Sequence, residues 1–352
     1  MLIKQLHIET SRGSLKAEIE LSNNATNHEF GFQLFRNGEE INYQKQLKQH
    51  FFHFNLDSAS GYYFVRAHVK DNNGITDQRT SSPVFINPIH IDVYKFKSLN
   101  NHEAIVHSGK DWEVPILFYP NEQDRLFVLT PSAINRSKSV LPAFTRFTWA
   151  ARHFFPGKVL CISDPTLKLH NRLGLSWCMG TTESDLSNEL AQLVEEIARS
   201  YKINNRNIIF WGSSSGGFSA LALSARIRDS TAVAINPQTD ALAYKVEDQV
   251  QLIKKVVFNN ASDQYIRDNY SKRINMLKLR EESRQNRNIL VQNILDEHHF
   301  EFHFTPYWEG LGYKIQEGWT EFGDDKSLVY RDIRGHVAET ETMVQDIVKM
   351  IL

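Results

Sequence analysis

The sequence predicts a mixed α/β fold with a mostly parallel sheet, preceded by a small all-β sandwich of immunoglobulin-like architecture. The chain has 352 residues, which at roughly 150 residues per domain corresponds to about two domains. Residues 1–88 show period-two alternation and frequent turns, without a helical period. From residue 89 onward, short apolar runs alternate with helical segments, a pattern typical of parallel sheets covered on both faces.

The composition narrows the class of protein. Lys plus Arg number 40 and Asp plus Glu 41, a formal charge of −1, so we expect no nucleic-acid partner. Hydrophobic residues at 41% and charged residues at 23% exclude wholesale disorder. No apolar run approaches the roughly 18 residues of a membrane-spanning helix, and no signal peptide is apparent. Two cysteines, Cys161 and Cys178, are too few for a disulfide framework. We therefore expect a soluble, cytoplasmic protein with free thiols.

The expected N-terminal domain consists of short antiparallel strands. The dipeptide Asn37-Gly38 follows an apolar run and predicts a hairpin, since both residues tolerate positive φ. Strands spaced by roughly 8–12 residues favour a sandwich. Ser81-Ser82-Pro83 and Asn87-Pro88 then predict a boundary, which divides the chain into domains 1–88 and 89–352. Strands are expected at 15–21, 30–35 and 62–70.

The second domain is expected to contain buried parallel strands with helices between them. Apolar residues within 185–203 fall on one helical face, and Ser184 is a suitable N-cap for that helix. The polar, helix-rich segment 239–287 predicts a helical cap inserted between two strands. Strands are expected at 125–129, 158–162, 207–211, 231–235 and 288–291.

The strongest chemical signal is the run G-S-S-S-G-G at 212–217, which fits G-x-S-x-G with Ser214 at its centre. An apolar strand precedes it, and a segment able to form a helix starts at Phe218. This strand–turn–helix context predicts a nucleophile elbow with an exposed serine hydroxyl. The next N–H group, that of Ser215, is then expected to stabilise an oxyanion at the helix N-terminus. The alternatives are a Ser/Gly-rich connecting loop and a phosphate-binding turn.

A serine nucleophile needs a base within hydrogen-bonding reach. Where a serine lies on such an elbow, the acid and then the histidine follow it in the chain. His336 precedes a C-terminal segment with helical periodicity and is the best candidate base. Asp296 follows the run 289–295 and is the best candidate for the residue that orients the histidine. Competing acids are Glu297, Asp324, Asp325 and Asp332.

A second oxyanion donor is expected from the loop Thr130-Pro131-Ser132-Ala133. Because Pro131 has no backbone N–H, the donor would be Ser132 or Ala133. The aromatic segments 144–149 and 175–180 are expected in the core, although Trp177 near a strand end could stack on a sugar.

Metal binding is the other chemistry that the residues suggest. Asp296, His299 and His303 form a D-x2-H-x3-H cluster, with His298 beside them, and this spacing would suit zinc on a helix. The segment 300–304 alternates like a strand, however, which would scatter the ligands. We therefore expect no metal site and interpret these histidines as flanking a pocket or hydrogen-bonding to catalytic residues.

On these motifs, the C-terminal two-thirds of the chain resembles α/β-hydrolases of the serine esterase and acyltransferase type. More narrowly, it is similar to bacterial α/β-hydrolase-like proteins of surface-glycan and accessory-secretion systems, some associated with carbohydrate O-acetylation or deacetylation. The resemblance implies an α/β-hydrolase fold, with Ser214 as nucleophile, Asp296 as acid and His336 as base. The chain departs from the family at Pro131-Ser132, where the family usually has small residues or glycine. The matching segments are 211–217, 235–238, 292–293 with Asp296, and 335–336.

The leading functional hypothesis is acyl-ester hydrolysis or transfer through a Ser-His-Asp triad and an acyl-enzyme, on an acetyl ester of a carbohydrate or a small ester. If a sugar hydroxyl resolves the acyl-enzyme and acetyl-CoA is the co-substrate, the protein is a sugar O-acetyltransferase of surface polysaccharide biosynthesis. No other cofactor is expected. A rival hypothesis is a non-catalytic scaffold whose N-terminal domain docks a glycan or a partner protein, and a third is a peptidase.

Overall fold

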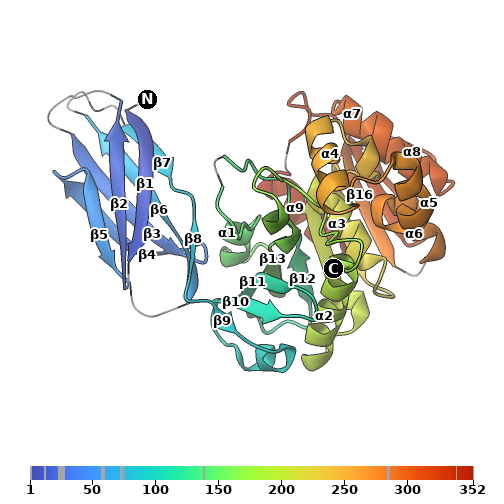
Figure 1. Ribbon diagram of the computed structural model, residues 1–352, viewed down its shortest axis with the longest axis horizontal. Helices are drawn as coiled ribbons and strands as arrows, with labels where there is room; N and C mark the ends of the chain where they lie inside the picture. Colours follow the sequence, from blue (N-terminus) through green and yellow to red (C-terminus); the bar gives the residue numbers. More distant parts are fainter. Residues whose placement is uncertain are drawn as a thin grey trace.

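The computed structural model describes residues 2–11, 13–22, 28–56, 60–71, 74, 76–137, 139–283, 286–337 and 339–351. A β-rich N-terminal part lies beside a larger part in which helices surround a central sheet (Figure 1). The central sheet is mixed and mostly parallel, so the predicted α/β class and the predicted β-rich start of the chain are confirmed.

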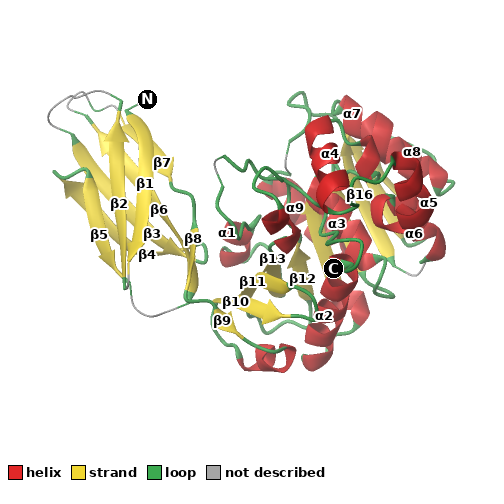
Figure 2. Cartoon of the chain, viewed as in Figure 1, coloured by secondary structure: helices red, strands yellow, loops and turns green. Residues whose placement is uncertain are grey.

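Two small antiparallel sheets form the N-terminal part (Figure 2). They share one apolar core, to which alternate residues of the strands contribute, among them Leu15, Phe32 and Val65. The turn Asn37-Gly38, with φ of 52° and 95°, joins two paired strands as predicted. One sheet contains β1 (Ile3–Ser11), β2 (Ser14–Leu21) and β5 (Phe51–Asn55). The other contains β3 (Glu29–Arg36), β4 (Glu39–Leu47), β6 (Gly61–Lys70), β7 (Thr76–Thr80) and β8 (Val84–Ile86).

The central sheet has ten strands in the order β17-β18-β16-β15-β14-β12-β13-β11-β10-β9. Neighbours from β13 to β18 along this order are parallel, whereas β11 and β17 are antiparallel to the strands beside them. Every residue of β12, β13, β14 and β15 is buried, as continuous apolar runs predict. The strands are β9 (Ile89–His90), β10 (Glu103–Ser108), β11 (Glu113–Tyr119), β12 (Leu126–Leu129), β13 (Lys158–Ile162), β14 (Ile208–Ser213), β15 (Thr231–Ile235), β16 (Arg287–Asn293), β17 (Gly318–Phe322) and β18 (Asp325–Tyr330).

Helices cover both faces of this sheet. On one face, α2 (Leu186–Ser200) and α3 (Ser215–Ser224) pack on the sheet, and α4 (Glu247–Val256), α5 (Asp263–Ile274), α6 (Met276–Glu282) and α8 (Thr305–Gly310) extend this layer. On the other face lie α1 (Phe147–Ala151) and α9 (Glu341–Ile351). The predicted helix-rich insertion thus consists of α4, α5 and α6. The short elements are α7 (Glu297–His299), the 3₁₀ helices η1 (Val93–Ser98), η2 (Pro165–Leu169), η3 (Asn205–Asn207) and η4 (Ala241–Ala243), and the π-helix η5 (Phe300–Phe304).

Three local predictions were wrong. The N-cap of α2 is Asp185, whose carboxylate accepts from the backbone N–H groups of Ser187 and Asn188, whereas the Ser184 hydroxyl donates to Asp111. Helix α3 begins at Ser215 rather than at Phe218. Residues 300–304 form a π-helix instead of a strand. A physical reason is that the aromatic rings at 300, 304 and 308 stack at i, i+4 spacing along η5 and α8, which a strand would not allow.

The proposed division at residue 88 falls between β8, which pairs with β6, and β9, which pairs with β10. The turn at Asn37 nevertheless contacts the central part of the protein. The Asn37 amide donates to the carbonyl of His102 at 3.0 Å, and the Tyr119 hydroxyl donates to the carbonyl of Asn37 at 2.7 Å. The Tyr62 ring also packs on Phe144, in the segment just before α1. The β-rich part therefore rests on the loop that leads into α1.

Two further findings concern the whole chain. Cys161 and Cys178 are buried free cysteines, and burial raises the pKa of both thiols. In the described part of the chain, no helix is long and apolar enough to span a membrane.

Candidate active site

Four neighbouring strands end at the candidate site. Ser214 follows β14, Gln238 lies just beyond β15, Asp296 lies just beyond β16, and His336 follows β18. These strands are consecutive in the order β18-β16-β15-β14 and parallel, so their carboxyl ends meet at one edge of the sheet. The sheet order therefore brings together residues that are far apart in the sequence.

Ser214 lies in a tight turn between β14 and α3. Its φ is 54° and its ψ is −121°, a conformation that is strained for a residue other than glycine. The turn leaves no room for side chains on its flanks: a Cβ on Gly212 would lie 2.3 Å from the carbonyl oxygen of Gly216, and one on Gly217 would lie 2.8 Å from Pro237 Cβ. The glycines thus allow the turn that leaves the Ser214 hydroxyl partly exposed.

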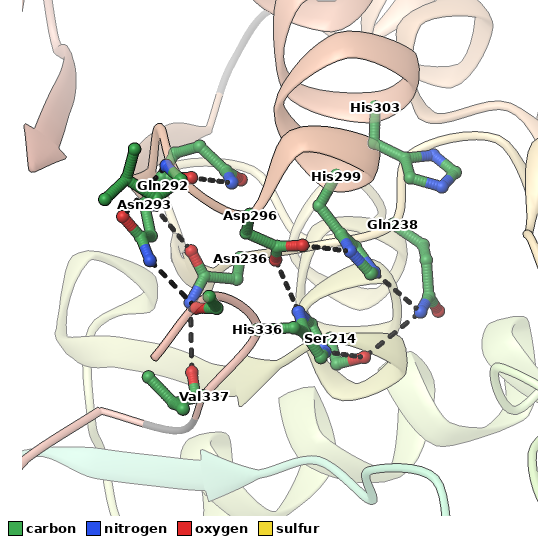
Figure 3. A network of polar contacts seen from close by, with 12 residues as sticks. Ser214, Asn236, Gln238, Gln292, Asn293, Asp296, His299, His303, His336 and Val337 are labelled. Carbon is green, nitrogen blue, oxygen red and sulfur yellow. Dashed lines mark hydrogen bonds and ion pairs between the residues drawn. The ribbon is translucent and has the colours of Figure 1, made fainter. Parts of the chain in front are cut away.

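A continuous chain of hydrogen bonds starts at the Ser214 hydroxyl (Figure 3). Ser214 Oγ lies 3.0 Å from His336 Nε2, and His336 Nδ1 lies 2.5 Å from Asp296 Oδ2. With Nδ1 protonated and donating to the carboxylate, Nε2 is the nitrogen that accepts from the serine. The histidine side chain is 33% exposed and the aspartate 4% exposed, so the acid is buried and the base is open to solvent on one side.

The Asp296 carboxylate accepts from a second histidine. His299 Nδ1 lies 3.0 Å from Asp296 Oδ1, and its ring stacks on that of His336 with centroids 4.0 Å apart and planes at 11°. Burial raises the pKa of Asp296, but the hydrogen bonds from both histidines outweigh this effect and hold the pKa well below its ordinary value. Burial also lowers the pKa of His299. The site therefore contains an ionised aspartate between a neutral buried histidine and the candidate base.

Gln238 closes this chain into a ring. Its buried amide nitrogen donates to Ser214 Oγ at 3.1 Å and lies 3.3 Å from His299 Nε2. The Trp177 indole N–H donates to Gln238 Oε1 at 2.8 Å, which orients the amide with its NH₂ group toward the serine. Trp177 is only 2% exposed, so it lies in the core as expected for this segment and does not offer its ring to a sugar. It supports Gln238 from the core.

Two asparagines hold the loop that carries His336. Asn236 donates to the carbonyl of Val337 at 3.0 Å and accepts from the backbone N–H of Asn293 at 2.7 Å. The Asn293 amide donates to the carbonyls of Asp332 and Gly335 at 2.7 and 2.8 Å. These bonds connect the ends of β15 and β16 to the histidine loop on both sides of His336 (Figure 3).

A buried ion pair also connects this loop to β14, the strand that leads to Ser214. The Arg146 guanidinium pairs with Glu339, three residues after His336, and donates to Ser213 Oγ at 2.5 Å. The Trp211 indole N–H donates to the same carboxylate at 2.9 Å. Burial raises the pKa of Glu339, but the charge of Arg146 and its hydrogen bonds outweigh this effect and lower it. The pair thus joins the segment before α1, strand β14 and the His336 loop.

The predicted oxyanion residues lie beside the elbow. Ser215 is the first residue of α3, so its N–H has no carbonyl partner one helical turn earlier. The Ser132 hydroxyl donates to the carbonyl of Ser213 at 3.1 Å, and a Cβ on Gly216 would lie 3.1 Å from Ser132 Oγ. The loop with Ser132 and Ala133 therefore flanks the N-terminus of α3, as an oxyanion loop must.

The competing acids lie elsewhere. Asp325 is buried in a bidentate pair with Arg280, Asp332 pairs with Arg334, and Glu297 and Asp324 are exposed. Of the five candidates, Asp296 is the one whose carboxylate contacts His336.

The histidine cluster is arranged differently from the D-x2-H-x3-H expectation. Among the described residues, the group whose ligand atoms lie within 4.8 Å of one another is Asp296, His299 and His336. In that group both imidazole Nδ1 atoms already face the carboxylate, so a cation would have to replace both hydrogen bonds. His303 is fully buried behind them, and burial lowers its pKa to about 3.

The sequence did not indicate the roles of Gln238 and Arg146, whereas the hydrogen bond between His299 and Asp296 agrees with the expectation that the histidines flank a pocket or bond to catalytic residues. One feature of the sequence could have indicated Gln238: it follows the strand β15, and the segment after β15 must lie beside the segment after β14 in a parallel sheet. Arg146 had no such feature, because it is in a loop, with a φ of 58°, and its partners Ser213 and Glu339 are 67 and 193 positions away.

No protein-family model and no curated protein sequence matches the chain. Among solved structures, it is similar to prolyl oligopeptidase B from Galerina marginata, with 11% identity and a TM-score of 0.51 over 98% of this chain and 56% of that one. It is also similar to dipeptidyl peptidase 4 from Porphyromonas gingivalis, with 11% identity and a TM-score of 0.50 over 98% of this chain and 55% of that one. A third similar structure is the capsule O-acetyltransferase of Neisseria meningitidis serogroup A, with 14% identity and a TM-score of 0.49 over 72% of this chain and 95% of that one. The chain thus spans little more than half the length of the two peptidases. At these identities the likeness to the two peptidases shows the fold, which is of the α/β-hydrolase type.

Proposed function

We propose that this protein is a serine-dependent acyl hydrolase or acyltransferase in which Ser214 is the nucleophile, His336 the base and Asp296 the acid. One observation carries the proposal: the unbroken chain from Ser214 Oγ through His336 to Asp296, with distances of 3.0 and 2.5 Å, at a strained strand-to-helix turn. A Ser/Gly-rich connecting loop would not need this turn, and a phosphate-binding turn would not need an oriented histidine.

In this mechanism, His336 Nε2 removes the proton of Ser214 as Oγ attacks the ester carbonyl carbon. The negative charge then develops on the carbonyl oxygen, where the N–H of Ser215 and that of Ser132 or Ala133 stabilise it. Asp296 stabilises the imidazolium and keeps its orientation. Collapse of the tetrahedral intermediate transfers the proton from His336 to the departing alcohol and leaves an acyl-enzyme. A second nucleophile, activated by the same histidine, resolves it.

The proposed substrate is an acetyl ester of a carbohydrate. The sequence resemblance to bacterial hydrolase-like proteins of glycan systems supports this class. Water as the second nucleophile makes the protein an esterase, whereas a sugar hydroxyl, with acetyl-CoA as acyl donor, makes it an O-acetyltransferase of surface polysaccharide. The partly exposed His336 can serve either acceptor, because one side of its ring is open to solvent.

The remaining parts of the proposal concern the whole chain. We propose that residues 1–88 form an immunoglobulin-like domain and residues 89–352 the catalytic domain. The two antiparallel sheets of the N-terminal part support this division. So does the passage of the chain from one sheet to another, since β8 pairs with β6 and β9 pairs with β10. A cytoplasmic location belongs to the same proposal, and the two free thiols agree with a reducing compartment. The N-terminal domain is proposed to dock a glycan or a partner protein.

Labelling with a fluorophosphonate probe tests the proposed function, with intact mass as the readout. Wild type and the Ser98→Ala control, which removes an exposed serine on η1, are expected to gain one adduct, and Ser214→Ala none. An unlabelled wild type that also leaves a short acetyl ester intact would overturn the proposal and favour the non-catalytic scaffold.

A further inference from the structure

A cavity of about 600 Å³ opens at the loop that contains the candidate oxyanion donor Ala133. It begins at Ala133, the residue after Ser132, and continues along two loops to the start of the helical insertion. The lining includes Asn135, Arg136 and Ser137 from one loop, Arg172 and Leu175 from the other, and Tyr244.

Contacts on two sides connect the wall of this cavity to the residues around Ser214. On one side, the Ser132 hydroxyl bonds to the carbonyl of Ser213, the residue before the nucleophile. On the other side, the Tyr244 ring packs edge-on against Trp177 at 5.9 Å, and Trp177 orients the Gln238 amide that donates to Ser214. A group bound in the cavity would therefore lie on the oxyanion-loop side of the site.

The charged side chains that line the cavity are all positive among the described residues. Arg136 and Arg172 contribute two guanidinium groups, and no carboxylate is among the described residues that line the cavity. The nearest acid to Arg172 is Asp248, at 3.9 Å, and both side chains are largely exposed, so this pair is weak. Two positive charges thus face a cavity without a counter-charge in its wall.

Arg136 is the more informative of the two. Its Nε and Nη1 atoms are buried from solvent and have no hydrogen-bond partner in the described part of the chain. The neighbouring amide oxygens are already used, since Asn135 Oδ1 accepts from Ser137 and Gln249 Oε1 accepts from the N–H of Gly174. Buried guanidinium donors without acceptors are unfavourable. These two nitrogens are closed off from solvent, so Arg136, which lines the cavity, must turn toward it to give them the acceptors of a planar anion.

We propose that this cavity, the Arg136 pocket, binds a carboxylate or phosphate group of the substrate, so that the enzyme selects anionic acyl esters or acyl donors. This inference rests on the proposed function at Ser214. The same chemistry has two sources: the carboxylate of an acidic sugar that bears the acetyl ester, or the phosphates of an acyl-thioester donor.

Matched pairs of compounds distinguish the two sources. Acetylated glucuronate is compared with acetylated glucose, and acetyl-CoA is compared with S-acetyl-N-acetylcysteamine, which has no phosphate. The measured quantity is the ratio of kcat/KM for the anionic compound to that for its neutral counterpart. Because both compounds of a pair meet the same enzyme, a loss of folded protein cancels from the ratio.

Arg136→Met is expected to lower this ratio at least tenfold in one of the two pairs, and Arg136→Lys to lower it less, since lysine keeps the charge but not the planar fork. The control Arg199→Met, which removes an exposed arginine on α2, should keep the wild-type ratio. A fall in the sugar pair identifies an acidic sugar, and a fall in the thioester pair identifies a phosphate-bearing donor. Wild-type ratios in both pairs for Arg136→Met would overturn the inference.

A binding measurement separates this inference from the proposed function. Ser214→Ala is titrated calorimetrically with glucuronate and with inorganic phosphate, and again after Arg136→Met is added. If Ser214→Ala binds one of the anions and the double variant binds that anion more weakly, the pocket is supported even if fluorophosphonate labelling of wild type has failed. Absence of binding of both anions to Ser214→Ala refutes the pocket even if labelling has succeeded.

Discussion

The buried pair between Arg146 and Glu339 makes a sharp prediction. Glu339 is fully buried and Arg146 is 8% exposed, and the carboxylate also accepts from the Trp211 indole. Glu339→Leu therefore leaves a buried guanidinium without its counter-charge and an indole N–H without its acceptor. Removing one partner of a buried pair costs about 3–5 kcal/mol, whereas removing both partners costs much less.

The magnitude follows from these contacts. We expect each of Glu339→Leu and Arg146→Met to lower the free energy of unfolding by about 3–5 kcal/mol. The double variant loses the pair as a unit and leaves the Trp211 N–H unpaired, at a cost of about 1–3 kcal/mol. The two substitutions should therefore be non-additive by at least roughly 3 kcal/mol.

Urea unfolding of wild type, both single variants and the double variant measures this coupling. The control is the same cycle on Arg331 and Glu317, an ion pair in which both side chains are half exposed and for which about 0–1 kcal/mol is expected. If the coupling between Arg146 and Glu339 is no larger than in this surface pair, the interpretation of Arg146–Glu339 as one buried unit is refuted.

Three further predictions concern the histidine side of the site. Gln238→Leu removes a donor to Ser214 and is expected to slow fluorophosphonate labelling about fivefold, since one hydrogen bond contributes about 1 kcal/mol. Asp296→Asn can offer an oxygen to only one of His299 and His336, so one ring must change its tautomer; we expect the rate of acetyl-ester hydrolysis to fall by about 10³–10⁴. His303 has a pKa of about 3 in the folded protein against about 6.5 when unfolded, so the unfolded chain binds more protons as pH falls. Stability should therefore drop by about 2 kcal/mol between pH 6.5 and 5, measured by urea unfolding, and His303→Gln should abolish this part of the drop.

Control variants or contradicting outcomes accompany these three predictions. Gln251→Leu, on the exposed side of α4, should label at the wild-type rate, and a Gln238→Leu variant that does the same would exclude Gln238 from the site. Equal rates for wild type and Asp296→Asn would mean that another group orients His336. The exposed His53 serves for the pH series: if His53→Gln changes the acid sensitivity as much as His303→Gln, burial of His303 is not its cause.

The sequence by itself determined the class of fold and the three residues at the centre of the proposed site. Strand and helix periodicity is local, because a strand buries every second residue and a helix every third or fourth. The elbow is a contiguous motif, so Ser214 could be found from its neighbours. Asp296 and His336 could be found because each follows a predicted strand or precedes a predicted helix.

Only the tertiary structure decided what surrounds these residues. Gln238 contacts His299 although the two are 61 positions apart in the sequence, and Ser214 contacts His336 at a separation of 122 positions. The order of the strands in the sheet produces these encounters, and the apolar pattern that predicts a strand does not specify which strand lies beside it. The segment 300–304 illustrates the same limit, since its alternation was strand-like but it is helical, with rings stacked along η5 and α8. Local patterns record which side chains are buried, whereas the partner of each buried polar group depends on how the elements pack.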